Sequence, residues 1–418
     1  MNLPAHVDVL VIGAGPAGAV AAAMLARKGY SVLVLEREQF PRFSIGESLL
    51  PQCMVYLGQA GMLDVVEAAG FQIKNGAAFA YKDARIQFDF AEKFTSGPTT
   101  TFQVQRARFD QLLADEAVSA GAMVVYRHEI TAVDLDGKQP RVTCRSPEGE
   151  SLDLTAKFLL DASGFGRVLP RLLDLELPSR FPVRQSCFTH VRDGITAPDF
   201  DRNKILITIH PEQRDVWYWT IPFSNGTCSI GVVGRREFFA DYPEDPDERL
   251  LSVIREDPGL ASLLRDAEIL QPVRQVVGYS ASVKTLHGPG FALLGNAGEF
   301  LDPVFSSGVT IAMKSATLAA EVLDRQFKGL ETDWEADFAA PLKRGIDTFR
   351  AFVTGWYELY FQDVIFHRVQ PPKLKAMICS VLAGYAWDAE NPYVRDSDRR
   401  LKALASFCAD DSGGYDFG

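Results

Sequence analysis

The chain has 418 residues, of which 47% are hydrophobic and 23% are charged. This composition is typical of a globular protein, and the length suffices for two or three structural lobes around a buried core. The net charge of −11 argues against a nucleic-acid surface, which normally carries a basic stripe, and gives no reason to expect attraction to an anionic membrane.

The cysteines and histidines give no sign of a metal site. The six cysteines include no C-x-x-C pair, and the six histidines form no cluster with carboxylates, so we expect reduced thiols and no bound metal. No apolar run reaches the ~20 residues that a membrane-spanning helix needs. The apolar N-terminal stretch also lacks the basic flank of a signal peptide. We therefore expect a cytoplasmic protein without a membrane span.

The first predicted unit is a strand, a Gly-rich turn, a helix and a second strand, in "VDVLVIGAGPAGAVAAAMLARKGYSVLVLE". Gly13 permits the tight turn, Gly15 lets the backbone approach a pyrophosphate, and Gly18 lets the helix pack closely on the strand. The helix N-terminus then offers free N–H groups to the phosphates. Glu36 ends the second strand, where an acidic group hydrogen-bonds ribose hydroxyls. The unit predicts a dinucleotide site, without distinguishing NAD from FAD.

A later segment indicates which dinucleotide is bound. "GPGFALLGNAGEFLDPVFSSGVTIAMKSATLAAEVL" again reads strand, polar turn and helix. It resembles the second FAD contact of two-lobed flavoprotein oxidoreductases, the hydroxylase and geranylgeranyl-reductase group. The segments that follow Arg106 and surround Asp161 are similar to further parts of that pattern. This chain has Gly295-Asn296 where the group usually has Gly-Asp, and Asn still accepts hydrogen bonds through its side-chain oxygen.

Within that group, the chain resembles the flavin-dependent halogenases that act on phenols or carrier-bound pyrroles. Its strand Trp217-x-Trp219-x-Ile221-Pro222 matches the WxWxIP motif of the family, and the turn from Phe300 to Gly308 matches FxxPxxSxG. "FPRFSIGESLLP" is similar to the segment that lies along the flavin, and "IKNGAAF" places Lys74 where the family has its catalytic lysine. The resemblance covers nearly the whole chain.

The Gly-rich turn and the resemblance together predict which residues contact FAD: Gly13, Gly15, Ala17, Gly18, Glu36, Arg37, Ser44, Ile45, Gly46, Glu47, Ser48, Arg106, Asp161, Gly295, Asn296, Pro303, Gly308 and Val309. The resemblance also implies that a separate flavin reductase supplies reduced FAD, and that oxygen and a halide (chloride or bromide) are consumed. Trp217, Trp219, Ile221 and Pro222 would keep substrate away from the flavin, so that hypohalous acid must travel to Lys74 and from there to a small aromatic or carrier-tethered substrate.

Three local questions stay open at the level of sequence. The turn Ser306-Ser307-Gly308 opens a helix, and its amides suit either a halide or the edge of the flavin ring. Lys74 is either a surface lysine or a partly desolvated one with a lowered pKa. A base that deprotonates the substrate ring is not evident, with Glu47 and Asp302 as candidates.

The predicted fold class is α/β, with a Rossmann-type FAD-binding lobe interleaved with a β-sheet substrate lobe. We assign residues 1–75, 103–178 and 279–335 to the FAD-binding lobe, and 76–102 and 179–278 to the substrate lobe, which reads as alternating strands. Residues 336–418 form a helical C-terminal segment, in which aromatic residues between 349 and 364 follow helical spacing. That helix would either cap a substrate channel or simply dock onto the lobes.

Two alternatives to a halogenase fit the same sequence. A monooxygenase or a geranylgeranyl reductase-like enzyme would use the same scaffold, because fold alone does not determine the reaction. A non-catalytic flavin-binding protein is the other. The joint presence of Lys74, Trp217, Trp219 and the FxxPxxSxG turn favours the halogenase.

Overall fold

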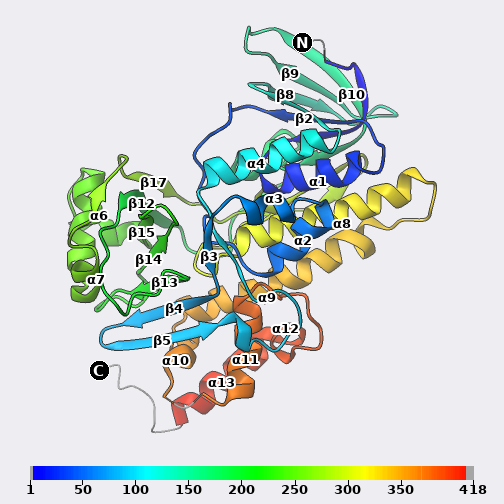
Figure 1. Cartoon of the computed structure of the whole chain (residues 1–418). Helices are drawn as coiled ribbons and strands as arrows, with labels where there is room; N and C mark the ends of the chain where they lie inside the picture. Colours follow the sequence, from blue (N-terminus) through cyan, green and yellow to red (C-terminus); the bar gives the residue numbers. More distant parts are fainter. Residues whose placement is uncertain (1–2, 369, 411–418) are drawn as a thin grey trace.

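A computed structural model describes residues 3–368 and 370–410 of the chain. Two sheets and a C-terminal group of helices make up the molecule (Figure 1), so the predicted α/β class with a helical C-terminal segment is confirmed. Each sheet is assembled from segments that are far apart in the sequence.

The first sheet has eight strands, with β1 at its centre between β10 and β2. The pairs β1–β10, β1–β2, β2–β7 and β10–β20 are parallel, as expected for a sheet covered on both faces. β9 pairs with β10 and β8 with β9, both antiparallel. The strands are β1 (His6–Ile12), β2 (Val32–Glu36), β7 (Met123–Tyr126), β8 (Glu129–Asp134), β9 (Arg141–Arg145), β10 (Ser151–Asp161), β19 (His287–Gly288) and β20 (Phe291–Leu293).

Three helices pack together on one face of this sheet (Figure 1): α1 (Pro16–Ala26), α4 (Arg106–Ser119) and α8 (Ser307–Phe327). Ten of the eleven residues of α1 are buried, and most of them are small. The small side chains let α1 lie close to α8. Shorter helices connect these parts: α2 (Gln52–Ala60), α3 (Leu63–Ala68) and α5 (Val168–Leu172). α1 follows β1, and α8 follows β20 after a connecting turn, with β10 between these two strands in the sheet. Open α/β sheets bind their ligands at the carboxyl ends of their strands.

The second sheet also has eight strands, in the order β16-β12-β15-β14-β13-β4-β5, with β17 paired to β12. One face packs against α6 (Pro246–Arg255) and α7 (Pro258–Leu263), and the other face joins the core of the first lobe. The strands are β4 (Gly76–Tyr81), β5 (Ala84–Asp89), β12 (Arg184–Arg192), β13 (Lys204–Ile209), β14 (Trp217–Pro222), β15 (Thr227–Arg235), β16 (Glu268–Ile269) and β17 (Arg274–Val277).

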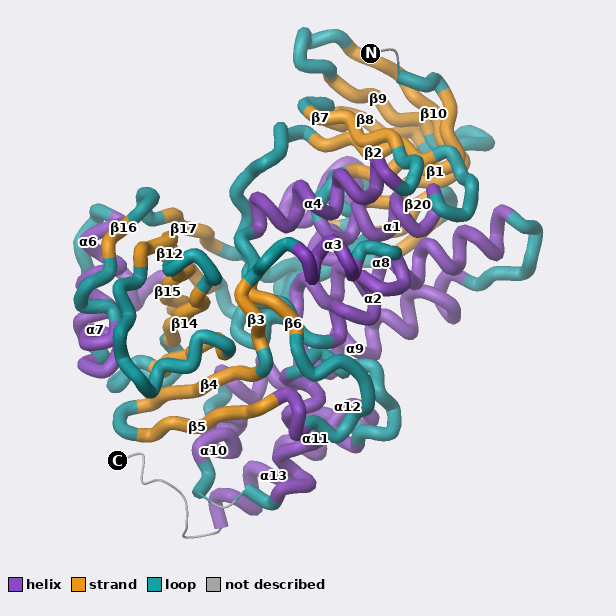
Figure 2. Tube along the Cα trace, in the orientation of Figure 1, coloured by secondary structure: helices purple, strands orange, loops and turns teal. Residues whose placement is uncertain are grey.

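A two-stranded ribbon lies between the two sheets in Figure 2. It pairs β3 (Gln72–Lys74) with β6 (Thr101–Gln103) in antiparallel register. A second short pair joins β11 (Glu176–Leu177) to β18 (Ser282–Val283). The β3–β6 ribbon thus connects the lobe built on β1 with the sheet that contains β4.

The C-terminal helices are α9 (Ala340–Tyr357), α10 (Tyr360–Phe366), α11 (Pro372–Leu382), α12 (Pro392–Arg395) and α13 (Ser397–Asp410). The sequence predicts one helix between residues 349 and 364, but the structure has two, α9 and α10. They are separated at Leu359, which has a φ of 71°. Phe352 and Trp356 are fully buried and pack around Phe305. α9 thus docks onto the core. Residues 411–418 of the predicted C-terminal segment lie outside the described residues.

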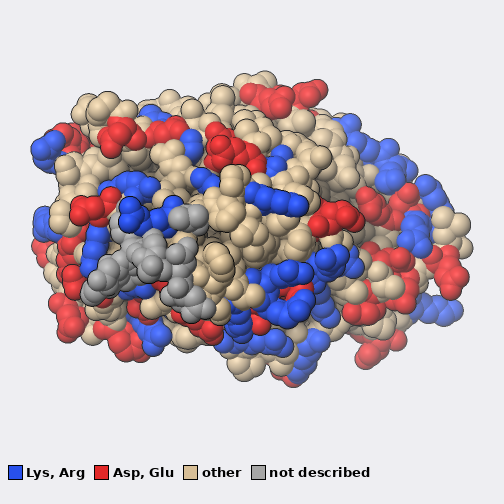
Figure 3. All heavy atoms as spheres, turned by 90° about the horizontal axis from the view of Figure 1, so that it is seen from below, with Lys and Arg blue, Asp and Glu red and all other residues tan. Residues whose placement is uncertain are grey.

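No described helix is both long and apolar enough to cross a membrane. Within residues 3–368 and 370–410, no three His, Cys, Asp or Glu side chains gather as a metal site would require. The face shown in Figure 3 carries acidic and basic side chains side by side.

Candidate active site

The Gly-rich turn after β1 has no room for a side chain at Gly13 or at Gly18. Gly13 has a φ of 95°, and a Cβ atom there would lie 2.7 Å from the carbonyl oxygen of Ala162. A Cβ atom on Gly18 would lie 1.9 Å from the carbonyl oxygen of Gly13. At the end of β2, a carboxylate oxygen of Glu36 accepts a hydrogen bond from the amide of Ala14, at 3.0 Å. The turn is therefore held rigidly at the N-terminus of α1, in the geometry that a pyrophosphate needs.

A cavity of about 1140 Å³ extends from this turn to the inner face of the second sheet. It accommodates a dinucleotide-sized ligand, with the N-termini of α1 and α8 both at its wall. The predicted residues that line it are Gly13, Gly15, Ala17, Glu36, Arg37, Ser44, Ile45, Gly46, Glu47, Ser48, Arg106, Trp217, Trp219, Ile221, Gly295, Asn296, Pro303, Ser306, Gly308 and Val309. Six predicted residues are not in the lining: Gly18, Lys74, Asp161, Pro222, Asp302 and Ser307.

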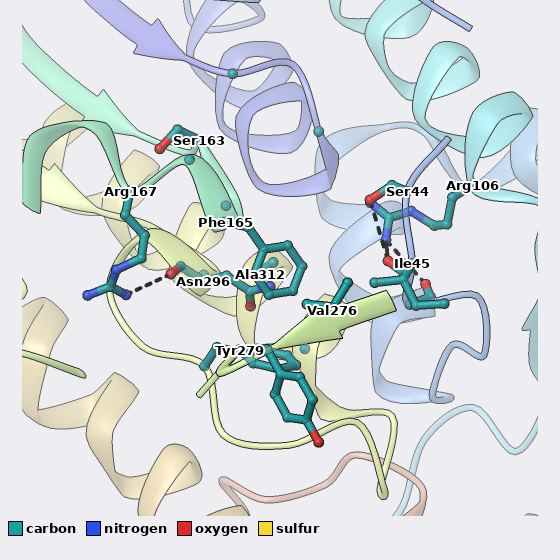
Figure 4. Close-up of a pocket in the computed structure, with 18 of the residues that line it drawn as sticks. Ser44, Ile45, Arg106, Ser163, Phe165, Arg167, Val276, Tyr279, Asn296 and Ala312 are labelled. Atoms are coloured by element: carbon teal, nitrogen blue, oxygen red, sulfur yellow. Dashed lines mark hydrogen bonds between the residues drawn. The ribbon is translucent and has the colours of Figure 1, made fainter. Parts of the chain in front are cut away.

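Arg106 fixes the segment that would run along the flavin. Its guanidinium forms a two-pronged salt bridge to Asp110, with N–O distances of 2.7 and 2.9 Å. It also donates to the carbonyl oxygens of Ile45 and Gly46 (Figure 4). Because a bidentate guanidinium has little freedom, Arg106 holds the backbone of residues 44–48 against the cavity.

Asp161 acts on the backbone beside the cavity. Its two carboxylate oxygens accept hydrogen bonds from the amides of Ser163 and Leu169, at 2.9 and 2.6 Å. Burial raises its pKa. Arg167, in the same turn, donates to the carbonyl oxygen of Asn296 at 3.2 Å (Figure 4). Asp161 and Arg167 thereby tie together the two turns that frame the cavity, and the sequence had not singled out Arg167.

Strand β14 places its aromatic residues as alternation predicts. Trp217, Trp219 and Ile221 all line the cavity, with Trp217 and Trp219 ring centroids 5.9 Å apart. The indole N–H of Trp219 donates to the Ser229 hydroxyl at 3.1 Å. Trp219 lies over Gly231 of the neighbouring strand, where a Cβ atom would be 2.3 Å from the indole ring. The two indoles form a fixed wall of the cavity.

Asp302 connects this wall to the FxxPxxSxG turn. Trp217 donates its indole N–H to the Tyr357 hydroxyl at 3.0 Å, and Tyr357 donates to Asp302 at 2.8 Å. Tyr279, which lines the cavity, donates to the same carboxylate oxygen at 3.3 Å. Burial raises the pKa of Asp302 to about 6. The guanidinium of Arg184 lies 3.4 Å from the centre of the Tyr357 ring.

The sequence offered no signal for Arg184, Tyr279 or Tyr357 in this network. Tyr357 is 140 residues from Trp217 and 55 from Asp302, so no local spacing relates them. Tyr357 is the last residue of α9 and directly follows Trp356.

We expect Tyr357→Phe to destabilise the protein by about 1–3 kcal/mol, because it leaves the buried N–H of Trp217 without an acceptor and removes a donor from Asp302. The control is Tyr360→Phe. The Tyr360 hydroxyl is buried without a hydrogen-bond partner in the part of the chain that is described, so its removal should be neutral or slightly stabilising. Thermal unfolding of the two variants measures the difference, and equal loss in both would contradict the network.

Lys74 is not a surface lysine. It is 1% exposed at the end of β3, and its Nζ donates to the carbonyl oxygen of Leu49 at 2.8 Å. The same Nζ lies 5.5 Å from the centre of the Phe90 ring. Burial lowers the pKa of Lys74 to about 7. An amine with that pKa is present in both protonated and neutral forms at neutral pH, which suits it to reactions with an electrophile.

The turn at residues 306–308 opens α8 toward the cavity. Ser306 has a φ of 56° and precedes the first helical residue, Ser307. Ser306 and Gly308 line the cavity, whereas Ser307 is buried beneath it. The first N–H groups of a helix have no partner within the helix and carry the positive end of its dipole. This end of the cavity can hold an anion or an electron-rich ring edge.

Glu47 forms the other carboxylate candidate for a base. It is 1% exposed, and its Oε1 lies 2.6 Å from Nε2 of His190. His190 packs between the rings of Phe43 and Phe223. Glu47 and Asp302 thus occupy two separate buried polar clusters, each bordering the cavity.

Comparison with known proteins agrees with this geometry. The family described as "FAD binding domain" matches residues 6–266. The tryptophan 2-halogenase of Chondromyces crocatus is 34% identical over 77% of this chain and 61% of its own length. A 1H-pyrrole-2-carbonyl-[peptidyl-carrier protein] chlorinase of Pseudomonas fluorescens is 28% identical over 95% of this chain and 93% of its own. The flavin-dependent halogenase rdc2 of Metacordyceps chlamydosporia is 31% identical over 80% and 68%, respectively.

Two solved structures share the whole architecture. A crystal structure described as a flavoprotein/dehydrogenase from Cytophaga hutchinsonii is 44% identical, with a TM-score of 0.94, covering 97% of this chain and 99% of that one. The myxobacterial chondrochloren halogenase CndH is 28% identical, with a TM-score of 0.75, covering 97% of both chains. These matches and the cavity define an FAD-dependent flavoprotein enzyme.

Within that class, the chain belongs to the flavin-dependent halogenase family. FAD is the cofactor that its Gly-rich turn and cavity fit. The chain spans 61% of the length of the tryptophan 2-halogenase but 93% of the pyrrole-type chlorinase.

Proposed function

We propose that this chain halogenates an electron-rich aromatic or heteroaromatic substrate, using reduced FAD, oxygen and chloride or bromide. When bound, reduced FAD supplies the two electrons and two protons with which oxygen, halide and one further proton become hypohalous acid and water. The second step exchanges a ring hydrogen for the halogen and releases a second water. The observation that carries the proposal is the buried Lys74, whose pKa is lowered to about 7 beside the flavin segment.

Each part of the site has a proposed task in this scheme. The amides at Ser306, Ser307 and Gly308 would hold the halide at the N-terminus of α8. The wall made by Trp217 and Trp219, with Ile221 and Pro222 at the end of β14, would keep the substrate from the flavin ring. Pro222 would support the wall from outside the cavity lining.

Lys74 would then direct the oxidant. Its amine would either donate a hydrogen bond to hypohalous acid or exchange an N–H hydrogen for the halogen, releasing water, and pass that halogen to the ring. The proton lost by the ring would go to a base, for which Glu47 and Asp302 are the candidates.

For the substrate, we propose an indole- or pyrrole-like ring, either free or tethered to a carrier. The names of two relatives support this class, one acting on tryptophan and the other on a carrier-bound pyrrole. The sequence contains one Gly-x-Gly-x-x-Gly unit at the start of the chain, which supports a separate flavin reductase as the source of reduced FAD.

The deciding experiment supplies chemically reduced FAD, oxygen and bromide to the protein together with a panel of phenols, indoles and pyrroles. We expect a brominated product, recognised by its isotope doublet in mass spectrometry, and its absence when bromide is omitted. Hydroxylated or reduced product without bromide incorporation would reject the halogenase reading.

A second candidate is a flavin-dependent monooxygenase or reductase on the same scaffold. The observation that favours it is the 44% identical structure, which is described as a flavoprotein/dehydrogenase. Such an enzyme would form no hypohalous acid and would not need Lys74 to deliver it. Oxidation or reduction of a substrate with undiminished rate in Lys74→Ala would support this candidate.

A further inference from the structure

The β3–β6 ribbon presents a buried polar face next to the cavity. Lys74 and Thr101 are directly opposite in its antiparallel register, and Ser48 forms a bridge to Gln103 on the other side of β6. Residues directly opposite in such a pair point to the same face, and alternate residues along a strand share that face. Ser48, Lys74, Thr101 and Gln103 therefore lie on one face.

Burial confirms which face is internal. Lys74 and Thr101 are each 1% exposed and Gln103 is 0% exposed, whereas Ile73, which points the other way, is 52% exposed. A row of four polar side chains inside a protein requires hydrogen-bond partners, because an unsatisfied buried polar group costs about 1–3 kcal/mol.

Most of that hydrogen-bonding capacity is unused. Ser48 Oγ, Thr101 Oγ1 and Gln103 Oε1 have no partner among residues 3–368 and 370–410. The amide nitrogen of Gln103 donates to the carbonyl oxygen of Arg202 at 2.9 Å, which fixes the side chain and leaves its oxygen free to accept. The ammonium form of Lys74 has three N–H donors, of which Leu49 accepts one.

The row also has a defined direction. Ser48 belongs to the lining of the cavity, and Lys74 does not. Gln103 and Thr101 lie between them along β6. Opposite residues in antiparallel strands have Cβ atoms roughly 4.5–5.5 Å apart, so the side chains of Thr101 and Lys74 leave the ribbon next to each other on its buried face.

We propose that Ser48, Gln103 and Thr101 bind a small polar oxidant on its way from the cavity to Lys74, and that Thr101 is the positioning residue that holds it against the lysine. The inference rests on the proposed function, which makes that oxidant hypohalous acid. The oxygen of hypohalous acid accepts from Lys74 and from the Thr101 hydroxyl, and its O–H donates to Gln103 Oε1. No bond is made or broken at Thr101.

The test is Thr101→Val, which keeps the shape and removes the hydroxyl, compared with Thr101→Ser, which keeps the hydroxyl. With reduced FAD, oxygen and bromide, we expect the Val variant to release about fivefold more free hypohalous acid per brominated product, the effect of one lost hydrogen bond. The free oxidant is trapped with monochlorodimedone outside the protein. The Ser variant should restore the native ratio.

The matched control is Thr220→Val. The Thr220 hydroxyl is also buried without a partner in the described part of the chain, and Thr220 lies on the face of β14 opposite the two tryptophans. We expect the native ratio in this variant. An equal ratio in native protein and Thr101→Val would overturn the proposal, as would an equal increase in Thr220→Val.

A second measurement does not depend on halogenation. The pKa of Lys74, followed by NMR of ¹³Cε-labelled lysine in protein without FAD, should fall further in Thr101→Val, because a polar neighbour of the ammonium is lost. An unchanged pKa would show that Thr101 does not face Lys74. A native protein that forms no brominated product but shows the pKa change would reject the proposed function while leaving the polar row in place.

Discussion

Lys74→Met is expected to lower brominated product by at least about 100-fold, the usual contribution of a positioned acid–base or nucleophilic group, while FAD binding is retained. FAD binding should persist because Lys74 lies outside the cavity lining. The oxidant should still form and appear as free hypohalous acid. The measurement is the ratio of product to trapped oxidant. The control is Lys314→Met, because Lys314 is another lysine whose pKa is lowered by burial, and it should leave that ratio unchanged.

The same substitution should raise thermal stability. The folded-state pKa of Lys74, about 7, lies below its ordinary value of 10.5, so between those values the unfolded chain binds more protons than the folded one. Native stability therefore rises with pH across this interval, and below pH 7 folding must bury a charge. Lys74→Met should have a higher Tm than the native protein at pH 7, and the difference in Tm should shrink toward pH 10. A lower Tm at pH 7 would show that the lysine is structural.

Gly18→Ala is expected to weaken FAD binding by at least about 100-fold, because the added methyl group overlaps the turn that holds the pyrophosphate. The overlap is with backbone, at 1.9 Å from the Gly13 carbonyl oxygen, so neither α1 nor the turn can avoid it by moving a side chain. Fluorescence titration with FAD measures the loss.

The control for this change is Gly58→Ala in the interior of α2, where the nearest atom to the new methyl group would be 4.0 Å away, on Leu63. That substitution should bind FAD normally and stabilise the helix slightly, because Ala is the better helix former. Unchanged FAD affinity in Gly18→Ala would mean that α1 can retreat from the turn.

The parts of the site that follow from local pattern were predictable. The Gly-rich turn and Glu36 lie where a strand-turn-helix-strand unit places them, and period-two alternation puts Trp217, Trp219 and Ile221 on one face. Only the family resemblance favoured a buried Lys74 over a surface one, because composition alone favours a surface lysine. Its low pKa follows from that burial.

Other features depend on contacts between distant segments. Tyr357 joins Trp217 to Asp302 only because the end of α9 packs against the second sheet, where Trp356 contacts Phe79 of β4, and no spacing reveals this contact. The break at Leu359 was also missed, since a leucine with positive φ is rare and the apolar spacing continues through it. The unpartnered hydroxyl of Thr101 becomes visible only once its surroundings are known.

The position of β20 in the first sheet bears on how the protein is made. β10 pairs with β1 on one side and with β20 on the other, and the cavity wall includes Ala312. A nascent chain on the ribosome therefore cannot form the complete flavin site until residue 312 has emerged. Until β20 has emerged, one edge of β10 stays open, and such edges promote aggregation. The need for chaperones during synthesis should therefore depend on how late these segments follow in the sequence. Free FAD should protect full-length chains from aggregation but not shorter nascent chains.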